Sequence, residues 1–300
     1  MFDTAPKLDC AGRSVRLDAP QVMGIVNVTP DSFSDGGQHA TRNAAIAHGL
    51  KLVEEGAAVL DIGGESTRPG ATPVSLEEEL LRVIPVVEAL AQRTSVPISV
   101  DTFKPEVMRA AVAAGAGMIN DIYALREPGA MEAACELRVP VVLMHARSAP
   151  HAMQDALYYD DVVGEVHRFL AERIFAAEMA GIDKRRLILD PGFGFDKTTT
   201  HNLTVLAQLQ RLQEFGLPVL AGLSRKRSIG ELTGRQIASE RVHGSVAAHL
   251  IAAQHGALLL RVHDVAATVD ALKVWSAVAA IPAPRVGAPA APTTRWPDED

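Results

Sequence analysis

The feature that most constrains this chain is the alternation of two kinds of segment. Short apolar runs are separated by longer stretches in which apolar residues recur about every 3.6 positions, the period of an amphipathic helix. An open doubly wound sheet would show the same local pattern, so the number of units matters. Eight units predict a closed (β/α)8 barrel, the TIM barrel of the α/β class. The runs expected to form its strands are 22–27, 57–62, 97–100, 117–120, 140–144, 187–189, 218–220 and 257–260.

The length of the chain fits one such barrel. Three hundred residues lie within the usual range of a single α/β barrel domain, which is predicted here over residues 22–283. Residues 1–21 are expected to include a short hairpin, at about 8–20, that closes the bottom of the barrel. Residues 284–300 are rich in proline and alanine and are predicted to form a flexible tail.

Two helices have recognisable starts. Ser75 is followed by Glu78 at the spacing of a capping box, in which each side chain satisfies a backbone N–H of the first turn. Pro105 is suited to the first turn of the next helix, where its missing N–H costs nothing.

Composition and charge exclude several classes of function. Aromatic residues make up only 4% of the chain and the formal net charge is -7, which argues against a protein that binds nucleic acid. No apolar stretch approaches the roughly 18–20 residues of a membrane span, and no signal sequence is evident. Cys10 and Cys135 are too few for a disulfide framework or a cysteine metal site. We therefore expect a cytoplasmic globular enzyme that binds neither nucleic acid nor membranes.

Polar residues recur where one predicted strand after another ends. In an α/β barrel these ends meet at one rim, where the active site of this fold is built. A single strand-end carboxylate often caps a helix, but capping does not predict an Arg-x-His and a Ser-Arg-Lys group in the same ring. The ring is therefore predicted to be an active site. Its members are Asn27, Asp61, Asp101, Asn120, Asp121, His145, Asp190, Ser224, Arg225, Lys226, Arg261 and His263.

The chemistry of the ring suggests its ligand. One group can hydrogen-bond a flat, nitrogen-rich heterocycle: Asp61, Asp101, Asn120 and Asp190. A second group can hold phosphate oxygens: Arg68, Lys226, Arg261 and His263. We therefore expect a substrate with a polar heteroaromatic end and an anionic end. A dinucleotide fingerprint and a P-loop are both absent, which argues against NAD and ATP.

Two polar loops at 27–37 and 63–72 are predicted to be lids that exclude water, and Phe33 in the first would need an apolar place to dock. His145 is the histidine most like a metal ligand. It has no histidine or cysteine partner at ligand spacing, so a structural or pocket-lining role is favoured.

Several long strings of the chain resemble those of the dihydropteroate synthases, enzymes of the folate pathway. They occur in the family's order and extend from about Val22 to about Ala271. They read MGIVNVTPDSFSDGG, DIGGESTRPGA, ISVDTFKPEV, INDI, LMH, LILDPGFGF, GLSRK and RVHDV.

The resemblance implies a transferase reaction. Such enzymes join 6-hydroxymethyl-7,8-dihydropterin pyrophosphate to p-aminobenzoate, giving 7,8-dihydropteroate and pyrophosphate. The family also implies a (β/α)8 barrel, a homodimer, a requirement for Mg²⁺ and inhibition by sulfonamides.

The resemblance also implies roles for individual residues. The pterin site would comprise Asp101, Asn120, Asp190 and Lys226, with Met144, Phe195 and Gly222 as its walls. The pyrophosphate site would comprise Asn27, Thr67, Arg261 and His263. The p-aminobenzoate site would comprise Phe33, Arg68, Pro69 and Ser224. Mg²⁺ would be bound by Asn27, with Asp31 or Asp35 approaching it.

Elementary chemistry suggests how such a site would react. Pyrophosphate is a good leaving group once Mg²⁺, Arg261 and His263 neutralise its charge. The dihydropterin can spread the positive charge that develops on its exocyclic methylene, and Asp101 is the leading candidate to stabilise it. We therefore expect a dissociative, SN1-like substitution, with Asp101, Lys226, Arg261 and His263 as the catalytic residues.

Three points depart from the family pattern or stay open. The segment ARSAPHAMQ after LMH lacks the family's glycine, and Phe103 replaces a smaller residue and is expected to pack. The carboxylate of p-aminobenzoate could be anchored by Ser224, by the backbone amide of Arg227 or by Arg68.

Two other functions compete with the main one: a pterin-binding methyltransferase barrel, and an inactive paralogue that acts as a binding protein. Activity with p-aminobenzoate separates the three.

Overall fold

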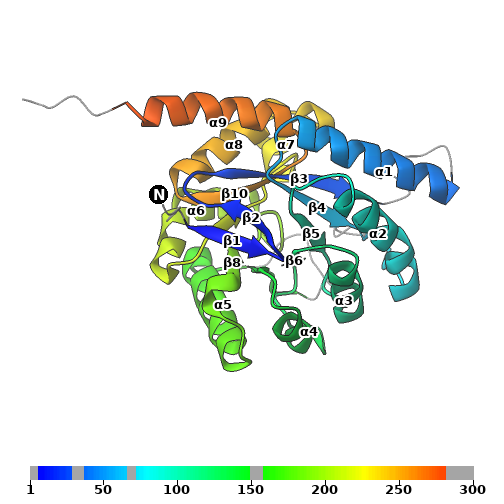
Figure 1. Ribbon diagram of the computed structural model, residues 1–300. Helices are drawn as coiled ribbons and strands as arrows, with labels where there is room; N and C mark the ends of the chain where they lie inside the picture. Colours follow the sequence, from blue (N-terminus) through cyan, green and yellow to red (C-terminus); the bar gives the residue numbers. More distant parts are fainter. Residues whose placement is uncertain (1–5, 29–36, 66–71, 149–157, 282–300) are drawn as a thin grey trace, which may run out of the picture.

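A computed structural model describes residues 6–28, 37–65, 72–148 and 158–281. Within these ranges eight parallel strands close into a barrel in the order β10-β3-β4-β5-β6-β7-β8-β9. The predicted (β/α)8 fold is therefore confirmed (Figure 1). The strands are β3 Gln21–Asn27, β4 Val59–Gly63, β5 Ile98–Asp101, β6 Met118–Asp121, β7 Val141–Met144, β8 Leu187–Asp190, β9 Val219–Ala221 and β10 Ala257–Val262.

Helices surround the barrel on its outside (Figure 1). They are α1 Gly37–Glu54, α2 Leu76–Ala91, α3 Pro105–Ala113, α4 Ala130–Leu137, α5 Val162–Met179, α6 Thr199–Ala207, α7 Arg227–Thr233, α8 Val242–Gln254 and α9 Val265–Ala279. Short 3-10 helices lie at η3 Lys184–Arg186, η4 Leu209–Phe215 and η5 Ala238–Glu240. None of the helices in the described ranges is long and apolar enough to cross a bilayer.

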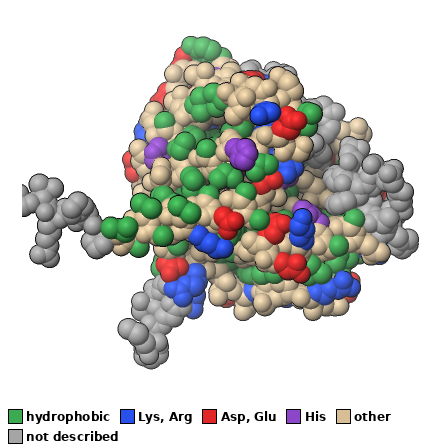
Figure 2. Space-filling model, turned by 90° about the horizontal axis from the view of Figure 1, so that it is seen from above, with side chains coloured by type: hydrophobic (Ala, Val, Ile, Leu, Met, Phe, Trp, Pro, Cys, Tyr) green, Lys and Arg blue, Asp and Glu red, His purple; other side chains and the backbone are tan. Residues whose placement is uncertain are grey.

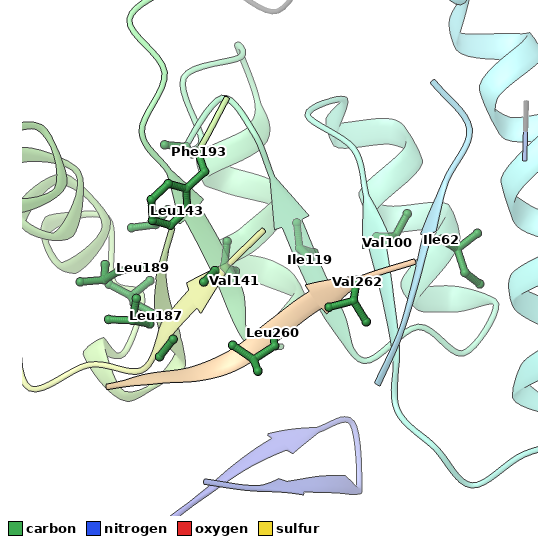
Figure 3. Packing of buried hydrophobic residues seen from close by; sticks show 14 of the residues in the cluster. Ile62, Val100, Ile119, Val141, Leu143, Leu187, Leu189, Phe193, Leu260 and Val262 are labelled. Atoms are coloured by element: carbon green, nitrogen blue, oxygen red, sulfur yellow. The ribbon is translucent and has the colours of Figure 1, made fainter. Parts of the chain in front are cut away.

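The alternation of side chains along each strand creates two separate cores. Residues that face outward pack against the helices, as Leu60 and Ile62 of β4 do, and Figure 3 shows this outer core at close range. Residues that face inward fill the barrel axis in a second core, which contains Met23, Val59, Met118, Val142, Ile188, Leu220 and Leu259. The barrel interior is therefore a packed apolar layer and not a channel.

The predicted N-terminal hairpin is confirmed and closes one end of the barrel. Strands β1 Lys7–Cys10 and β2 Arg13–Arg16 pair antiparallel across a turn whose two residues have positive φ. Leu8 and Val15 pack into the inward-facing core. The hairpin also touches the start of β6, because a Cβ on Gly117 would lie 2.3 Å from the carbonyl oxygen of Cys10. Only glycine allows this close approach.

The predicted helix starts are confirmed with one difference. Ser75 caps α2 by accepting a hydrogen bond from the Glu78 N–H at 3.2 Å, and Pro105 occupies the first turn of α3. The Glu78 carboxylate instead pairs with Arg82 at 2.8 Å, so only half of the predicted capping box forms. The Glu–Arg pair one turn apart on the same helix face wins this competition.

The strand boundaries differ from the predicted ones where polar residues continue a strand. β8 includes Asp190, and β10 extends beyond Leu260 to Val262. Arg261 therefore lies within a strand rather than after it. Its side chain points along the barrel axis because it alternates with the outward-facing Leu260 and Val262.

A buried ion-pair cluster joins three parts of the chain. Glu65 follows β4, Glu79 lies on α2, and Lys104 directly precedes α3. The Lys104 ammonium donates to Glu65 at 2.7 Å, to Glu79 at 2.6 Å and to the Val74 carbonyl at 2.8 Å. Glu65 and Glu79 are 5% and 1% exposed, so both carboxylates are buried beside this cation. Burial opposes the charge of Lys104, but its hydrogen bonds to both carboxylates raise its pKa.

We predict that Lys104→Met lowers the free energy of unfolding by about 3–5 kcal/mol, because it removes the counter-charge that Lys104 supplies to two buried carboxylates. Urea denaturation followed by circular dichroism measures this. Lys273→Met is the matched control, since Lys273 and its partner Asp270 are 72% and 77% exposed. Equal stability of the two variants would contradict the role given to Lys104.

Candidate active site

The alternation that builds the inner core also places the polar ring. Two residues farther along a strand, the side chain points to the barrel axis again but lies nearer the carboxyl-end rim. On four strands this step passes from an apolar residue of the inner core to a polar one. The pairs are Val59 and Asp61, Met118 and Asn120, Ile188 and Asp190, and Leu259 and Arg261. The polar site therefore rests directly on an apolar layer.

Arg261 connects three strands at the centre of this ring. Its Nε donates to Oδ2 of Asp61 at 2.6 Å, and its Nη2 donates to Oδ2 of Asp101 at 2.5 Å. The Asn120 amide donates to the same Asp61 oxygen at 3.0 Å. The structure thus brings together Asp101, Asn120 and Arg261, as predicted for a common site.

Asp61 was expected to hydrogen-bond the heterocycle, and the structure shows partners for it that were not predicted. Its side chain is fully buried, and one of its oxygens accepts from Asn120 and Arg261. It lies beneath the ligand-facing surface because it is one register level deeper than Asp101: Asp61 pairs with Ser99 on β5, and Asp101 pairs with Gly63.

The charges of this group are strongly coupled. Burial raises the pKa of Asp101 to about 7, Arg261 opposes this shift, and the negative charges of Asp61 and Glu79 add to it. Burial disfavours the charged form of Arg261, but Asp61 and Asp101 raise its pKa above the usual range. Arg261 therefore stays charged, whereas Asp101 ionises less readily than an exposed aspartate.

Asp190 ends β8, and Lys226 lies after β9 at the start of α7, close enough for the two charges to influence each other. Burial raises the pKa of Asp190, and the Lys226 ammonium opposes that shift. Burial lowers the pKa of Lys226 to about 8, and Asp190 opposes it. The Lys226 ammonium donates to the Phe193 carbonyl and lies 4.6 Å from the ring centroid of Phe195.

The loop after β8 is shaped around Asp190. Gly192 donates its N–H to the Asp190 carboxylate at 2.7 Å and has φ +68°. A Cβ at this position would lie 2.0 Å from the His145 carbonyl oxygen. Glycine is required for both reasons, which gives a physical meaning to the DPG sequence.

An apolar wall borders the polar groups. Met144 and Phe195, both predicted as pterin walls, lie in this small cluster. Phe103 packs in it and is 7% exposed, as expected of a packing residue. The other members are Ile122, Tyr123 and Ala146. Gly222 lies beside Arg261, since a Cβ on it would be 3.9 Å from the Arg261 Cβ. A flat aromatic ligand can therefore contact apolar side chains and carboxylates together.

The Ser-Arg-Lys and Arg-x-His groups are joined by a hydrogen bond. Ser224 is 5% exposed, its hydroxyl oxygen accepts the His263 N–H at 3.1 Å, and it pairs with His263 Nδ1 at 2.9 Å. Arg225 forms a paired contact with Asp264, with distances of 3.0 and 2.6 Å. These contacts hold the loop after β9 against the loop after β10.

Part of the predicted site lies outside the described residues: Asp31, Phe33, Asp35, Thr67, Arg68 and Pro69. The predicted lids fall largely in the same segments. Asn27 is described and ends β3 at the rim. Within the described ranges there is no group of three or more histidine, cysteine, aspartate or glutamate side chains that could hold a metal.

Two buried residues with basic side chains, Lys197 and His249, lie near the site and were not predicted to contribute to it. Lys197 is 3% exposed and its ammonium contacts His145 Nδ1 at 2.9 Å, the Gly192 carbonyl at 2.9 Å and the Phe195 carbonyl at 3.2 Å. Burial lowers the pKa of Lys197 to about 7 and that of His145 to about 2. His145 was expected to have a structural or pocket-lining role, and its contact with Lys197 is consistent with the first of these. The position of Lys197 directly after DPGFGFD was the available signal, but lysines usually face solvent.

His249 is the other buried base that was not predicted to contribute. Its Nε2 accepts the Leu223 N–H at 3.2 Å, so its Nδ1–H donates to the Ser245 carbonyl at 2.7 Å. Burial lowers the pKa of His249 to about 4, which keeps this neutral form at physiological pH. The helix α8 thereby supports the loop that carries Ser224 and Lys226.

Comparison with known proteins places this site in a family. The model of the family described as pterin binding enzyme matches residues 23–263. The dihydropteroate synthase of Escherichia coli (strain K12) is 55% identical over 271 residues, which cover 90% of this chain and 96% of that protein. The dihydropteroate synthase of Bacillus subtilis (strain 168) is 44% identical over 258 residues, 86% of this chain and 88% of that protein.

Solved structures agree with these relatives. Dihydropteroate synthase of Xanthomonas albilineans with 4-aminobenzoic acid is 73% identical with a TM-score of 0.89, and covers 93% of this chain and 100% of that one. The same enzyme in complex with 7,8-dihydropteroate is 70% identical with a TM-score of 0.86, covering 92% and 100%. The Yersinia pestis enzyme with a sulfonamide drug complex is 50% identical with a TM-score of 0.87, covering 92% and 100%. With its predicted ring assembled on the predicted barrel, this chain belongs to the pterin binding enzymes, among the dihydropteroate synthases.

Proposed function

We propose that this chain joins 6-hydroxymethyl-7,8-dihydropterin pyrophosphate to p-aminobenzoate, giving 7,8-dihydropteroate and pyrophosphate. The observation that carries this proposal is the buried ring in which Asp101, Asn120 and Asp190 meet Lys226 and Arg261 beside an apolar wall. A relative that is 70% identical is known in complex with 7,8-dihydropteroate, and another relative binds a sulfonamide drug complex. Both small molecules are therefore the expected ligands here.

The pterin end of the substrate fits the deeper half of the ring. The Asp190 carboxylate can accept hydrogen bonds from the ring N–H and amino groups, and the Lys226 ammonium can donate to the ring carbonyl. Asn120 offers its amide oxygen, since its NH2 group already donates to Asp61. Met144 and Phe195 supply apolar surface for the flat ring.

The anionic end belongs to the groups nearer the rim. Arg261 donates to the two carboxylates through Nε and Nη2. Within the described part of the chain, this leaves Nη1 to donate to a ligand. Together with His263, Asn27 and Thr67 it would hold the pyrophosphate. The residues proposed for p-aminobenzoate are Phe33, Arg68, Pro69 and Ser224, and the three candidate anchors of its carboxylate stay open.

The reaction we propose is dissociative. The C–O bond to pyrophosphate breaks, both electrons leave with pyrophosphate, and the positive charge on the methylene spreads into the dihydropterin. The ionised Asp101 carboxylate stabilises that cation, because a fixed charge costs no reorganisation in a buried site. The arylamine nitrogen then forms the C–N bond and loses a proton.

Mg²⁺ suits the chemistry of this end of the site. The ion prefers oxygen ligands and usually keeps waters and substrate phosphates in its shell, so it does not need a complete protein cage. The Asn27 amide oxygen, with Asp31 or Asp35, would hold it. When bound, Mg²⁺ would neutralise charge on the leaving pyrophosphate.

We predict that Asp190→Asn weakens pterin binding at least about tenfold, because a hydrogen bond to a charged group contributes about 1.5–3 kcal/mol. Isothermal titration with 6-hydroxymethylpterin measures this. Asp183→Asn is the control, as Asp183 pairs with Arg185 on the surface. Wild-type affinity in Asp190→Asn would refute the role of Asp190.

We predict that purified protein releases pyrophosphate and forms dihydropteroate only when Mg²⁺ is present, and that chelation by EDTA abolishes turnover reversibly. A coupled assay for pyrophosphate, run with and without p-aminobenzoate, measures both. Without p-aminobenzoate, substrate labelled with 18O at the bridging position should still exchange its label into non-bridging positions. Absence of that exchange would argue against the dissociative path, and absence of any product would argue for a methyltransferase or an inactive paralogue.

We further propose a homodimer that forms through α9 and the adjoining part of α8. Val274 and Val278 lie one turn apart on α9 and are 68% and 64% exposed, Ile281 follows at 71%, and Ile251 on α8 is 41% exposed. Figure 2 shows apolar side chains over this part of the surface. Apolar side chains at this spacing form a stripe that suits packing against a second copy.

We predict that the double substitution Val274→Glu and Val278→Glu converts the dimer to a monomer, since it buries charge in the proposed interface. Light scattering coupled to gel filtration gives the mass. Phe175→Glu on α5, which replaces another exposed apolar residue, should leave a dimer. A wild-type monomer at micromolar concentration would contradict the proposal.

A further inference from the structure

Asp61 is a buried carboxylate that the proposed reaction does not use directly. It is 0% exposed and lies on β4, beneath the ligand-facing groups. Its Oδ2 accepts two hydrogen bonds, from Asn120 at 3.0 Å and from Arg261 at 2.6 Å. Its Oδ1 has no hydrogen-bond partner within the described part of the chain. A single oxygen atom therefore links two side chains of the proposed substrate site.

The two donors come from different parts of the barrel. Asn120 lies on β6 and Arg261 on β10, and in the barrel order β4 lies between these strands. An ionised carboxylate has no proton to donate, so Asn120 must turn its NH2 group toward Asp61 and its carbonyl oxygen away from it. In the same way the bond to Nε fixes the plane of the Arg261 guanidinium, which Asp101 then braces through Nη2.

We infer that Asp61 is a positioning residue. It orients the Asn120 amide toward the pterin and the Arg261 guanidinium toward the anionic end of the substrate, and it does not itself contact the substrate. This inference rests on the proposed function for the identity of the ligands. The contacts of Asp61 themselves do not depend on it.

Asp61 also acts on Asp101 through its charge. The charged groups that influence Asp101 are Arg261, which favours its ionised form, and Asp61, Glu79 and Asp121, which disfavour it. Lys226 lies within electrostatic reach of Asp101 as well. Removing the charge of Asp61 removes one repulsion and also frees Arg261 to pair more fully with Asp101. Both changes lower the pKa of Asp101.

The unpartnered Oδ1 allows charge and geometry to be tested separately. In Asp61→Asn the amide carbonyl can occupy the place of Oδ2 and accept both hydrogen bonds, while the NH2 group takes the place of Oδ1. This variant removes the charge and keeps the acceptor. Asp61→Ala removes both and leaves Asn120 free to rotate.

Asp196→Asn is a closely matched control. Asp196 is 3% exposed, one oxygen accepts two N–H groups, from Arg147 and Ser148, each at 3.0 Å, and its other oxygen has no partner in the described ranges. It therefore repeats the burial and bonding of Asp61. It differs in that its charge is not among the main influences on the pKa of Asp101.

The first measurement is the pH profile of kcat/KM for the pterin pyrophosphate, whose acid limb reports ionisations of the free enzyme and substrate. The substrates ionise identically in every assay, so any change between variants belongs to the protein. Activity that needs ionised Asp101 rises with pH through its pKa. We expect the acid limb of Asp61→Asn to move about one pH unit lower, the effect of removing one nearby like charge, and that of Asp196→Asn to stay in place. An unmoved limb in Asp61→Asn would overturn the electrostatic part.

The second measurement is binding of 6-hydroxymethylpterin by calorimetry, which needs no turnover. We expect Asp61→Ala to lose at least about tenfold in affinity, the usual effect of an unmade buried hydrogen bond, and Asp61→Asn to lose much less. Equal affinities of wild type and Asp61→Ala would overturn the positioning role. If the wild-type protein binds the pterin but forms no dihydropteroate, the proposed function fails while this comparison still decides the role of Asp61.

Discussion

The guanidinium of Arg261, held between the carboxylates of Asp61 and Asp101, is the interaction on which the mouth of this barrel depends. The layer below it is apolar, so an unpaired charge on the fully buried Asp61 would lack both water and a partner. Breaking one member of such a buried group typically costs about 3–5 kcal/mol, because the remaining charge stays uncompensated. The same ion pairs hold the Arg261 guanidinium in a defined orientation. Under the proposed function, stability and ligand recognition would therefore depend on the same three side chains.

The period of two along each strand makes this arrangement possible. One set of residues faces the helices and can be uniformly apolar, whereas the other faces the axis and changes from apolar to polar on approaching the rim. A slip of one residue in any strand would exchange the two sets and bury its carboxylate among helices. The apolar layer thus fixes strand register, and register in turn fixes the heights of Asp61, Asn120, Asp190 and Arg261 in the site.

The sequence predicted the barrel and the members of the ring because both follow from local patterns. Asp190 ends an apolar run, and a parallel barrel brings all such ends to one rim. The sequence did not indicate which side chains of the ring would pair with one another. Asp61 and Arg261 are 200 positions apart, and their contact depends on the register of strands that are not neighbours in sequence. Asp61 was therefore assigned to the ligand instead of to Arg261.

Other misses have the same physical origin. Lys197 resembles a solvated lysine in sequence, and only the fold of the loop after β8 encloses it beside His145. His249 lies on α8 with nothing in its spacing to indicate the N–H of Leu223 as its partner. Even the local capping box at Ser75 was half realised, since Arg82 competes for Glu78. Propensity predicts which groups are near an element's end, and packing decides which of them pair.

The N-terminal hairpin limits the direction from which a ligand can approach the polar ring. Leu8 and Val15 close the far end of the barrel, and the apolar layer fills the axis above them. In the described part of the chain, a molecule that reaches the ring therefore comes from the carboxyl-end rim and leaves on the same side. A short segment at the opposite end from the ring thereby leaves the barrel with one accessible end.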